Sequence, residues 1–550
     1  MLWQGGRCAI ARRPGDAARG TVRTALALDV GPRVHSRPAG PGVAVDKLRT
    51  LDELAAIAAA ARAAGKDVVL AHGVFDILHI GHKRHLETGK LNGDILIVTL
   101  TADDYVNKGP GRPIFPEKLR AEMLSALDVV DYVGISPSPG GELVIEKIRP
   151  SVYIKGAEYS DEKNDLTGRI KTETACVERF GGRVVFTDDI TFSSSSLANR
   201  ALQVFPEDAA EYLANVRGQV SFGELQAQLR ALQGMRCLVV GDTILDEYIY
   251  VEPLGKPAKE NIIATRYLER EMFSGGVIAT ANTTAQFCNH IDLVTLLGHP
   301  DNREEFIRHS LHPHINLVPF YREGAPTTVK SRLVDPGYMK KLIEIAYLED
   351  APLPPETQAE INGWIDAEIE KYDMVMINDF GHGLIDEELI EIMCRKARFL
   401  AISAQTNSAN RGFNLVTRYP RADVVCIDEP EARLAAADRH SPIEAVIRRK
   451  LETRMDCRTF IVTHGKLGCV VSAQGGRIEH IPALIDEALD TMGAGDAFFA
   501  VASPLIANGC DPFMAAFMGN AVGAMKIRIV GHRHQISDVE ILKYLASLLK

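Results

Sequence analysis

The stretch DVVLAHGVFDILHIGH, residues 67–82, decides the fold of the first part of the chain. Its residues 68–71 are apolar and include two β-branched valines, so the segment at 67–72 predicts a buried strand. Gly73 then leads into a helical segment, and the run DILIVTL at 94–100 predicts the next strand. Strand, helix and strand in this order form a βαβ unit. Because the alternation continues over residues 66–200, we expect a parallel-sheet α/β domain there.

The same alternation starts again at CLVVGD, residues 237–242, and continues to Lys550. Residues 250–273 and roughly 318–349 have strand-like stretches that do not fit it, and we expect them to form a small β lid over a cleft. The fold class predicted is therefore α/β with two domains. The expected organisation is a disordered Arg-rich tail at 1–45, a first α/β domain at 46–200, a helical connector at 201–235 and a second α/β domain at 236–550.

Composition excludes several classes of protein. Hydrophobic residues make up 46% of the 550 residues and charged residues 24%, as in globular proteins. A net charge of -10 argues against a nucleic-acid binder with a broadly basic surface. No apolar run reaches the roughly 18 to 20 residues that span a bilayer. The nine cysteines show neither a CxxC pair nor zinc-ligand spacing, which favours a cytoplasmic protein with reduced thiols.

The charge is unevenly distributed along the chain. Residues 1–45 contain seven Arg and two Asp but no Lys or Glu, so this tail carries +5 and the remainder carries -15. Its Gly, Pro and Arg content without apolar periodicity predicts disorder. A transit peptide and a mis-assigned start codon are the alternative interpretations.

His79 and His82 lie at the predicted start of the helix that follows Gly73. At a spacing of three, both imidazoles project from one face of the first turn. Helix N-termini bind phosphate, glycine lets backbone approach it closely, and two imidazoles aimed at one point can stabilise a phosphoryl-transfer transition state. The alternatives are two surface histidines or half of a metal site. Cations and hydroxyls further along favour the phosphate site: Lys108, Arg112, Lys155 and Ser193–Ser196.

These segments resemble the cytidylyltransferase-like nucleotidyltransferases with the HxGH motif, in particular the adenylyltransferase half of bifunctional ADP-heptose synthesis enzymes. The resemblance rests on GVFDILHIGH, TAD at 101–103, KGPGRPIFPEKLR and VYIKGAEY. It implies a Rossmann-like domain that transfers a nucleotidyl group from an NTP to a sugar or polyol phosphate and releases pyrophosphate. His79 and His82 would then be catalytic. The nucleotide site implied comprises Gly73, Phe75, Asp76, Asp103, Lys108, Arg112, Lys155, Ser194, Ser195 and Ser196. One departure is FSSSSLANR, where the family has a Ser-Thr-Thr type sequence.

In the second domain, the stretch DTMGAGDAFFA at 490–500 predicts a tight turn that opens a buried helix. The free N–H groups of such a turn form an anion pocket, and Asp496 at its edge could accept the proton of an attacking hydroxyl. Two alternatives stand beside this interpretation. The glycines could belong to a dinucleotide-binding fingerprint, which is incomplete here, or Asp496 could merely favour the helix dipole.

Nearly all of 236–550 resembles the ribokinase (PfkB) family of sugar kinases, with the family's motifs in the family's order: VVGDTILDEYIY, SGGVIATANTTA, PTTVKSRLV, NDFGHG, VVCIDEPEARL, VTHGKLG and DTMGAGDAFF. PTTVKSRLV is most similar to the heptose-phosphate kinase branch. The resemblance implies a ribokinase-like α/β sandwich with a small β lid, and Asp496 as the catalytic base. The site residues implied are Gly493, Ala494 and Gly495 as the anion hole, Thr463, Gly465, Gly468 and Asn520 for ATP, Asp246, Gly275, Gly276, Lys330 and Arg332 for the sugar, and Asp428 and Glu431 for Mg2+ through water.

Three departures bear on the sugar. Ala279 stands where the family has a sugar-contacting Asn, with Asn282 the nearest Asn, and Asp428 replaces the Asn of the Asn-x-x-Glu motif. KPAKENII also replaces the heptose branch's Ser-Pro-Glu-Ala-Pro segment. These changes put the sugar's identity in doubt and leave a lapsed kinase domain as an alternative.

Together the two resemblances imply a bifunctional enzyme that phosphorylates a heptose 7-phosphate with ATP and makes an NDP-heptose of the ADP-heptose type. The expected cofactors are Mg2+ and ATP, with ATP or CTP for the transferase and K+ as a further candidate. The family's bifunctional members carry the kinase first, so the order here is reversed, which suggests a variant serving another lipopolysaccharide or capsule. The expected partners are sugar phosphates, nucleotides, a separate phosphatase and further copies of the chain. The alternatives are a polyol-phosphate cytidylyltransferase joined to a sugar kinase of other specificity, and a nucleotide-binding scaffold.

Overall fold

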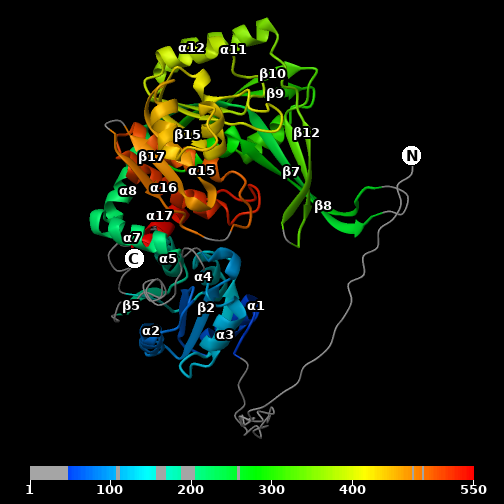
Figure 1. Ribbon diagram of the computed structural model, residues 1–550. Helices are drawn as coiled ribbons and strands as arrows, with labels where there is room; N and C mark the ends of the chain where they lie inside the picture. The colour runs from blue at the N-terminus through cyan, green and yellow to red at the C-terminus, as the bar shows by residue number, and fades with distance from the viewer. Residues whose placement is uncertain are drawn as a thin grey trace, which may run out of the picture. The chain divides into compact units, whose positions relative to one another are not determined.

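The structure is a computed structural model that describes residues 47–106, 112–156, 169–187, 205–256, 261–337, 339–473, 476–485 and 488–550 (Figure 1). The predicted tail at 1–45 lies outside these residues. The predicted α/β fold class is confirmed, because both domains are built on parallel sheets with helices on their faces. In the described ranges, every helix is too short or too polar to cross a membrane.

The first domain contains a five-stranded parallel sheet with strand order β3-β2-β1-β4-β5. Its strands are β1 (Val68–Gly73), β2 (Ile95–Thr101), β3 (Tyr132–Ser136), β4 (Val152–Gly156) and β5 (Arg183–Thr187). Its helices are α1 (Leu51–Ala63), α2 (Ile80–Lys90), α3 (Glu117–Ser125), α4 (Glu142–Ile148) and α5 (Arg169–Arg179). The order reverses at β1, where ligands of open α/β sheets bind beyond the carboxyl ends of the strands.

Both faces of this sheet are covered, because alternate strand residues point to opposite sides. Val69 and Ala71 of β1 pack with residues of α2 and α3, whereas Val68 and Leu70 pack with residues of α1, α4 and α5. The apolar run of β1 is thus buried on both sides, as expected of a central parallel strand.

The second domain contains a nine-stranded sheet with strand order β10-β9-β6-β13-β14-β15-β16-β17-β18. The strands are parallel except at one edge, where β17 and β18 are antiparallel. Their bounds are β6 (Arg236–Gly241), β9 (His290–His299), β10 (Ile315–Glu323), β13 (Met374–Asp379), β14 (Leu400–Ala404), β15 (Arg421–Asp428), β16 (Asp456–Thr463), β17 (Cys469–Ala473) and β18 (Ile478–Ile481).

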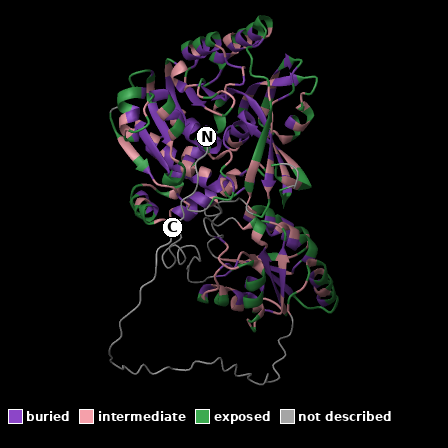
Figure 2. Ribbon diagram, turned by 45° about the vertical axis from the view of Figure 1, so that its right-hand side comes forward, coloured by how far each residue is buried: buried purple, intermediate pink, exposed green. Residues whose placement is uncertain are grey.

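Two hydrophobic cores lie on the two faces of the nine-stranded sheet, and Figure 2 shows the strands buried between helices. The first face carries α7 (Glu207–Gln219), α8 (Phe222–Arg230), α9 (Val277–Thr284), α10 (Glu304–Ser310), α15 (Ala494–Ala507), α16 (Pro512–Lys526) and α17 (Asp538–Leu548). The second face carries α11 (Pro355–Glu368), α12 (Glu387–Lys396), α13 (Glu429–Ala436) and α14 (Ile443–Val446). Helices α7 and α8, from the predicted connector, therefore pack into the core of the second domain.

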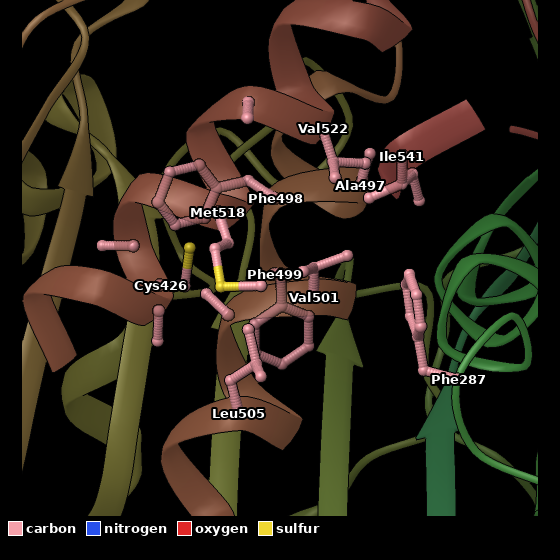
Figure 3. Packing of buried hydrophobic residues seen from close by; sticks show 14 of the residues in the cluster. Phe287, Cys426, Ala497, Phe498, Phe499, Val501, Leu505, Met518, Val522 and Ile541 are labelled. Atoms are coloured by element: carbon pink, nitrogen blue, oxygen red, sulfur yellow. The ribbon is translucent and has the colours of Figure 1, made fainter. Parts of the chain in front are cut away.

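Helix α15 is apolar on nearly all sides and is held in the middle of its layer. Phe498, Phe499 and Leu505 lie among residues of α16 and the sheet, with Met518 and Cys426 close by (Figure 3). A helix that is buried on every side is held in one position, because packing on each side opposes its displacement. The position of its first turn, which contains Asp496, is fixed by this packing.

A separate four-stranded sheet with strand order β12-β11-β7-β8 corresponds to the predicted lid. Its strands are β7 (Thr243–Gly255), β8 (Ala264–Gly276), β11 (Val329–Asp335) and β12 (Lys340–Tyr347). The prediction that the segment at roughly 318–349 belongs to the lid is partly wrong, because β10 belongs to the main sheet, where it pairs in parallel with β9. An edge strand with an irregular apolar pattern gives no sequence signal of the sheet it joins.

Candidate active sites

The two histidines of the first domain lie together at the start of α2. His79 is the N-cap residue, and its Nδ1 accepts a hydrogen bond from the backbone N–H of Gly81 at 3.1 Å. The ring of His82 lies 4.0 Å from the ring of His79, centre to centre. Because Nδ1 of His79 is an acceptor, its proton is on Nε2, which is a donor. The predicted pairing of the imidazoles is present in the structure.

The ring of Phe75 packs against the ring of His82. The backbone of Phe75 has a φ of 50°, which turns the chain back, and its buried ring lies 5.4 Å from the ring of His82. A Cβ at position 73 would lie 3.3 Å from the Phe75 ring, so glycine at that position allows the ring to approach the backbone. Gly73 and Phe75 thus shape the loop between β1 and α2.

Asp76 and Arg112 form a buried ion pair with each other. The Arg112 Nη1 to Asp76 Oδ2 distance is 2.7 Å, and neither side chain is exposed by more than 1%. Asp76 also accepts hydrogen bonds from the backbone N–H groups of Ile114 and Phe115, at 2.6 and 3.3 Å. These contacts attach the segment at 112–115 to the loop after β1, which is a positioning role for two residues predicted to bind nucleotide.

Arg120 is a fully buried cation that sequence reasoning missed. It donates to the carbonyl oxygens of Val74, Thr101 and Phe115 at 2.6 to 2.9 Å and pairs with Asp103 Oδ1 at 2.6 Å. It therefore joins the ends of β1 and β2 to α3. The signal that could have found it is an arginine on the apolar side of the helix in EKLRAEML.

Lys155, at the end of β4, pairs with the buried Glu173 at 2.7 Å, and Glu173 also accepts from the N–H of Gly141 at 2.9 Å. Burial and the nearby Lys155 lower the pKa of His72 to about 3, so this imidazole is neutral. Its Nδ1 lies 3.0 Å from Thr99 Oγ1, while its buried Nε2 has no partner within the described part of the chain. The predicted Lys108, Ser194, Ser195 and Ser196 lie outside the described residues.

In the second domain, Asp496 is in the first turn of α15, directly after the turn Gly493-Ala494-Gly495. Gly493 has a φ of 74°, and the Asp496 side chain is buried, with the residue 7% exposed. Burial and the charge of Asp246 raise the pKa of Asp496 to about 7, against the opposing charges of Lys526 and Lys330. A carboxyl group in this state can exchange a proton near neutral pH.

The residues predicted to contact the sugar gather on the lid strands. Lys330 of β11 lies directly opposite Asp246 of β7. Arg332 forms a short ion pair with Asp246 and donates from Nε to Glu344 at 2.8 Å, so its charge is already matched. Burial lowers the pKa of Lys330, an effect that the charge of Asp246 opposes.

Gly275 and Gly276 are required by close backbone contacts. A Cβ at position 275 would lie 2.3 Å from Asp246 Oδ2. Gly276 has a φ of 56°, and a Cβ there would lie 2.7 Å from the carbonyl oxygen of Asp242. These glycines bring β8 against β7 and present Asp246 at the start of α9. The side chain of Asn282 donates to the carbonyl oxygen of Ser310 and accepts from the N–H of His312.

Asp428 and Glu431 form a capping box at the start of α13, in which each carboxylate accepts the backbone N–H of the other at 2.8 Å. Burial and mutual repulsion raise the pKa of Glu431, and burial raises that of Asp428. Glu431 is buried and Asp428 is exposed at the end of β15, so this pair of carboxylates can meet a hydrated Mg2+ from the solvent side. No set of three or more His, Cys, Asp or Glu metal ligands occurs in the described ranges, so water and nucleotide phosphates would complete the coordination.

The residues predicted to line the ATP site lie after β16 and on α16. Thr463 ends β16 opposite Asp428. Gly468 has a φ of 88°, and a Cβ there would lie 2.0 Å from the carbonyl oxygen of Ile481, so only glycine fits. Gly465 also has a positive φ, of 52°. Asn520 donates to the carbonyl of Pro482 at 2.8 Å, which fixes the segment after β18.

Further polar groups near Lys330 were missed by sequence reasoning. Asp242 accepts hydrogen bonds from the N–H groups of Phe380 and His382 at 2.9 and 3.3 Å. His382 is 3% exposed, and within the residues described neither of its ring nitrogens has a hydrogen-bond partner. Burial and Lys330 lower the pKa of His382 to about 4, so the ring is neutral. A neutral imidazole with both nitrogens unused can bind a hydroxyl, which both donates and accepts.

Two protein-family models match separate parts of the chain. Residues 70–201 match the family described as cytidylyltransferase-like, and residues 236–538 match the pfkB family of carbohydrate kinases. The bifunctional protein HldE of Geobacter metallireducens is 36% identical over 168 residues, 30% of this chain and 32% of the relative. HldE of Geotalea uraniireducens is 40% identical over 140 residues, 25% of this chain and 27% of the relative. The chain thus spans about a third of the length of these curated relatives.

Among solved structures, a ribokinase of Thermotoga maritima is 20% identical, with a TM-score of 0.44, and the match covers 57% of this chain and 99% of that one. The order of the two domains, transferase first and kinase second, is as predicted. Since the kinase match extends over more than half of the 550 residues, the chain belongs to the pfkB family of carbohydrate kinases.

Proposed function

We propose that the chain is a bifunctional enzyme, a sugar-phosphate kinase and a sugar-phosphate nucleotidyltransferase. The observation that carries the proposal is the buried carboxyl group of Asp496 at the N-terminus of α15, with Asp246 and Lys330 acting on its charge. The paired imidazoles of His79 and His82 at the N-terminus of α2 support the second activity. The identity with proteins named HldE supports a heptose 7-phosphate as the kinase substrate and an NDP-heptose of the ADP-heptose type as the final product.

In the proposed kinase reaction, the anomeric hydroxyl of the sugar gives its proton to Asp496 as its oxygen attacks the γ-phosphorus of ATP. The bond from that phosphorus to the β,γ-bridging oxygen breaks, and ADP leaves. Backbone N–H groups of the turn at 493–495 stabilise the negative charge of the transferred group. Asp246 and Lys330 orient the sugar phosphate, and the neutral His382 binds one of its hydroxyls.

Mg2+ bound to ATP would neutralise phosphate charge in both reactions. In the kinase, Asp428 and Glu431 would hold its hydration shell, since both carboxylates lie in a capping box that leaves lone pairs for water. These two residues position the nucleotide and take no part in proton transfer.

In the proposed transferase reaction, an oxygen of the sugar 1-phosphate attacks the α-phosphorus of the nucleotide, and pyrophosphate leaves. His79 donates a hydrogen bond from Nε2, and His82 acts beside it on the same phosphate. Arg120 and the pair of Asp76 and Arg112 keep the loop around the histidines in place.

Between the two reactions the 7-phosphate of the bisphosphate must be removed, so a separate phosphatase in the cytoplasm is part of the proposal. The eight described cysteines are all free, as suits a reducing compartment. ATP is the proposed nucleotide of the transferase. A polyol-phosphate cytidylyltransferase joined to another sugar kinase is the second candidate, favoured by the cytidylyltransferase-like match and by Ala279 in the sugar segment.

We also propose that the chain forms a homo-oligomer through the lid sheet. Large apolar side chains are exposed on its strands and hairpin: Leu254, Ile262, Ile263, Tyr267, Leu268, Ile343, Ile345 and Tyr347. Exposed apolar side chains of this kind favour contact with another protein surface, and a second copy offers a matching one.

The test of the bifunctional proposal is a paired assay that follows ADP and pyrophosphate separately. The protein is incubated with Mg2+, with ATP or CTP, and with a panel of heptose, hexose and polyol phosphates. We expect Asp496→Asn to lower ADP formation by at least about 1000-fold and to spare pyrophosphate release, and His82→Ala to do the reverse. If wild-type protein forms neither product, or both variants match it, the proposal fails and a nucleotide-binding scaffold remains.

A further inference from the structure

Lys526 is a buried cation at the base of the kinase site. It is the last residue of α16, only 5% exposed, and its Nζ donates a short hydrogen bond to the carbonyl oxygen of Gly531. The C-terminal end of a helix carries partial negative charge and stabilises an ammonium group. Burying a charged lysine is costly unless such groups compensate it, so its presence beside a reaction site calls for an explanation.

The ammonium group belongs to the network that supports the turn at Gly493. A Cβ at position 493 would lie 3.3 Å from Lys526 Cε and 2.5 Å from His532 Cε1, so the turn rests directly on these two side chains. Gly531 donates from its N–H to Asp490 Oδ2 at 2.8 Å, and Asp490 Oδ1 accepts from the N–H of Met492 at 3.1 Å. A chain of contacts therefore runs from the ammonium group through Gly531 and Asp490 back to the turn.

The charges around Asp496 come from three elements. Asp246 on β7 raises the pKa of Asp496, whereas Lys526 on α16 and Lys330 on β11 lower it. The neighbouring His532 contributes no charge, because burial and Lys526 lower its pKa to about 3. Lys526 is therefore the cation that acts on Asp496 from the side of the anion hole.

The charge of Lys526 itself is balanced by its surroundings. Burial lowers its pKa to about 8, with Lys341 acting in the same direction, while Asp490, Asp496 and Asp246 oppose the change. The group is thus mainly protonated at neutral pH. Asp490 stays ionised, because hydrogen bonds from Lys341, Tyr248 and Gly531 outweigh burial and lower its pKa to about 2.

We infer that Lys526 is a positioning residue of the phosphoryl-transfer site, a built-in cation that holds the turn at 493–495 in its anion-binding shape and favours the ionised form of Asp496. The inference rests on the proposed kinase function and deepens it. Since Lys526 itself supplies a positive charge beside this turn, we expect kinase turnover without added K+.

The test compares Lys526→Met, Lys526→Gln and Lys526→Arg with wild type in the kinase assay. We expect Lys526→Met to lower kcat about 100-fold, as loss of one preorganised electrostatic group does, with a smaller change in KM. The rise of the rate with pH should move to higher pH, because removing a positive charge makes Asp496 harder to ionise. Added ammonium or K+ should raise the rate of Lys526→Met at least tenfold and leave the rate of wild type unchanged.

Two further variants separate charge from structure. Lys526→Arg keeps the charge and should retain more activity than Lys526→Gln, which keeps only a donor for Gly531. Lys396→Met is the matched control, because Lys396 also ends a helix, α12, and donates to a backbone carbonyl, that of Asp366 at 2.9 Å, but lies on the opposite layer. Its kinase rate and pH profile should equal those of wild type.

Equal rates for the Arg and Gln variants, no rescue by ammonium or K+, or an unchanged pH profile in Lys526→Met would overturn the inference. If wild type phosphorylates no sugar phosphate, the proposed function fails. The effect of Lys526 on Asp496 can then still be tested without substrate, by measuring protein stability against pH. The unfolding free energies of wild type and Asp496→Asn should differ by an amount that changes with pH up to about pH 7, where Asp496 titrates in the folded protein. When Lys526→Met is added to both proteins, this change should continue to higher pH. The same pH range of change with and without Lys526→Met would show that Lys526 does not act on Asp496.

Discussion

Asp496 must lose its proton to act as a base, and its surroundings make that loss occur near neutral pH. Burial and Asp246 raise its pKa to about 7. We therefore expect kcat/KM of the kinase reaction to increase about tenfold per pH unit below pH 7, to level off between pH 7 and pH 8, and to fall at higher pH, where Lys526 loses its proton. The check is a pH profile from 5.5 to 9. A rate that already reaches its plateau at pH 5.5 would contradict the assignment of Asp496 as the base.

Single residues differ in how far their roles could be predicted from the sequence. His79, His82 and Asp496 could be predicted as site residues because each stands in a dense motif at the start of a helix, where local spacing alone brings the groups together. Arg120 and His382 were missed because their importance comes from burial and from partners distant in the sequence. Such long-range contacts leave no local pattern.

Asp76 and Arg112 have a structural role that the sequence does not show. Both lie in motifs that the resemblance assigns to nucleotide binding, yet in the structure each side chain is engaged by the other in a buried ion pair. A charged residue near a phosphate site can bind the ligand or hold the loop that binds it, and the two cases look alike in sequence. Only the partner atoms distinguish them.

At the scale of elements, the junction of β8 with α9 depends on glycine. Gly276 has φ 56° and ψ -136°, and a Cβ there would lie 2.7 Å from the carbonyl oxygen of Asp242. We expect Gly276→Ala to destabilise the protein by about 1–3 kcal/mol and to weaken sugar binding, because the clash displaces the strand that carries Asp246. Thermal unfolding and the KM for the sugar phosphate measure the two effects.

Gly218 provides the matched control. It lies in the last turn of α7, and a Cβ there would meet no atom within 4 Å. Gly218→Ala should stabilise the protein by about 0.5–1 kcal/mol through helix propensity and leave both activities unchanged. Equal stability of the two alanine variants would show that the backbone at position 276 is not strained.

The elements that the sequence predicts well are those whose apolar pattern is complete within one segment. The strands β1, β2 and β6 lie where the apolar runs predict them. β10 could not be assigned to its sheet, because pairing with β9 depends on residues elsewhere in the chain. The lid strands were predicted as strands but not in their order, which the parallel pairing of β7 with β11 sets.

For the whole molecule, the exposed apolar side chains of the lid sheet predict self-association. A monomer would have a mass of 60.2 kDa, and light scattering should give at least about twice that value. Ile343→Lys, on an exposed side chain of β12, should shift the protein towards the monomer mass, because the interface would have to bury a charge. Gly218→Ala serves again as the control that keeps the wild-type mass. A wild-type mass near 60 kDa would contradict the proposal.

The two-sided main sheet also determines what a saturation mutagenesis experiment would record. Met376 of β13 packs in the layer that carries α15 and the turn at 493–495, whereas its neighbour Ile377 packs in the opposite layer with α11 and α12. Substitutions along such a strand should therefore alternate, residue by residue, between positions at which turnover falls before abundance and positions at which abundance falls first. The effects of substitution along the strand should therefore vary with a period of two residues, as the directions of its side chains do.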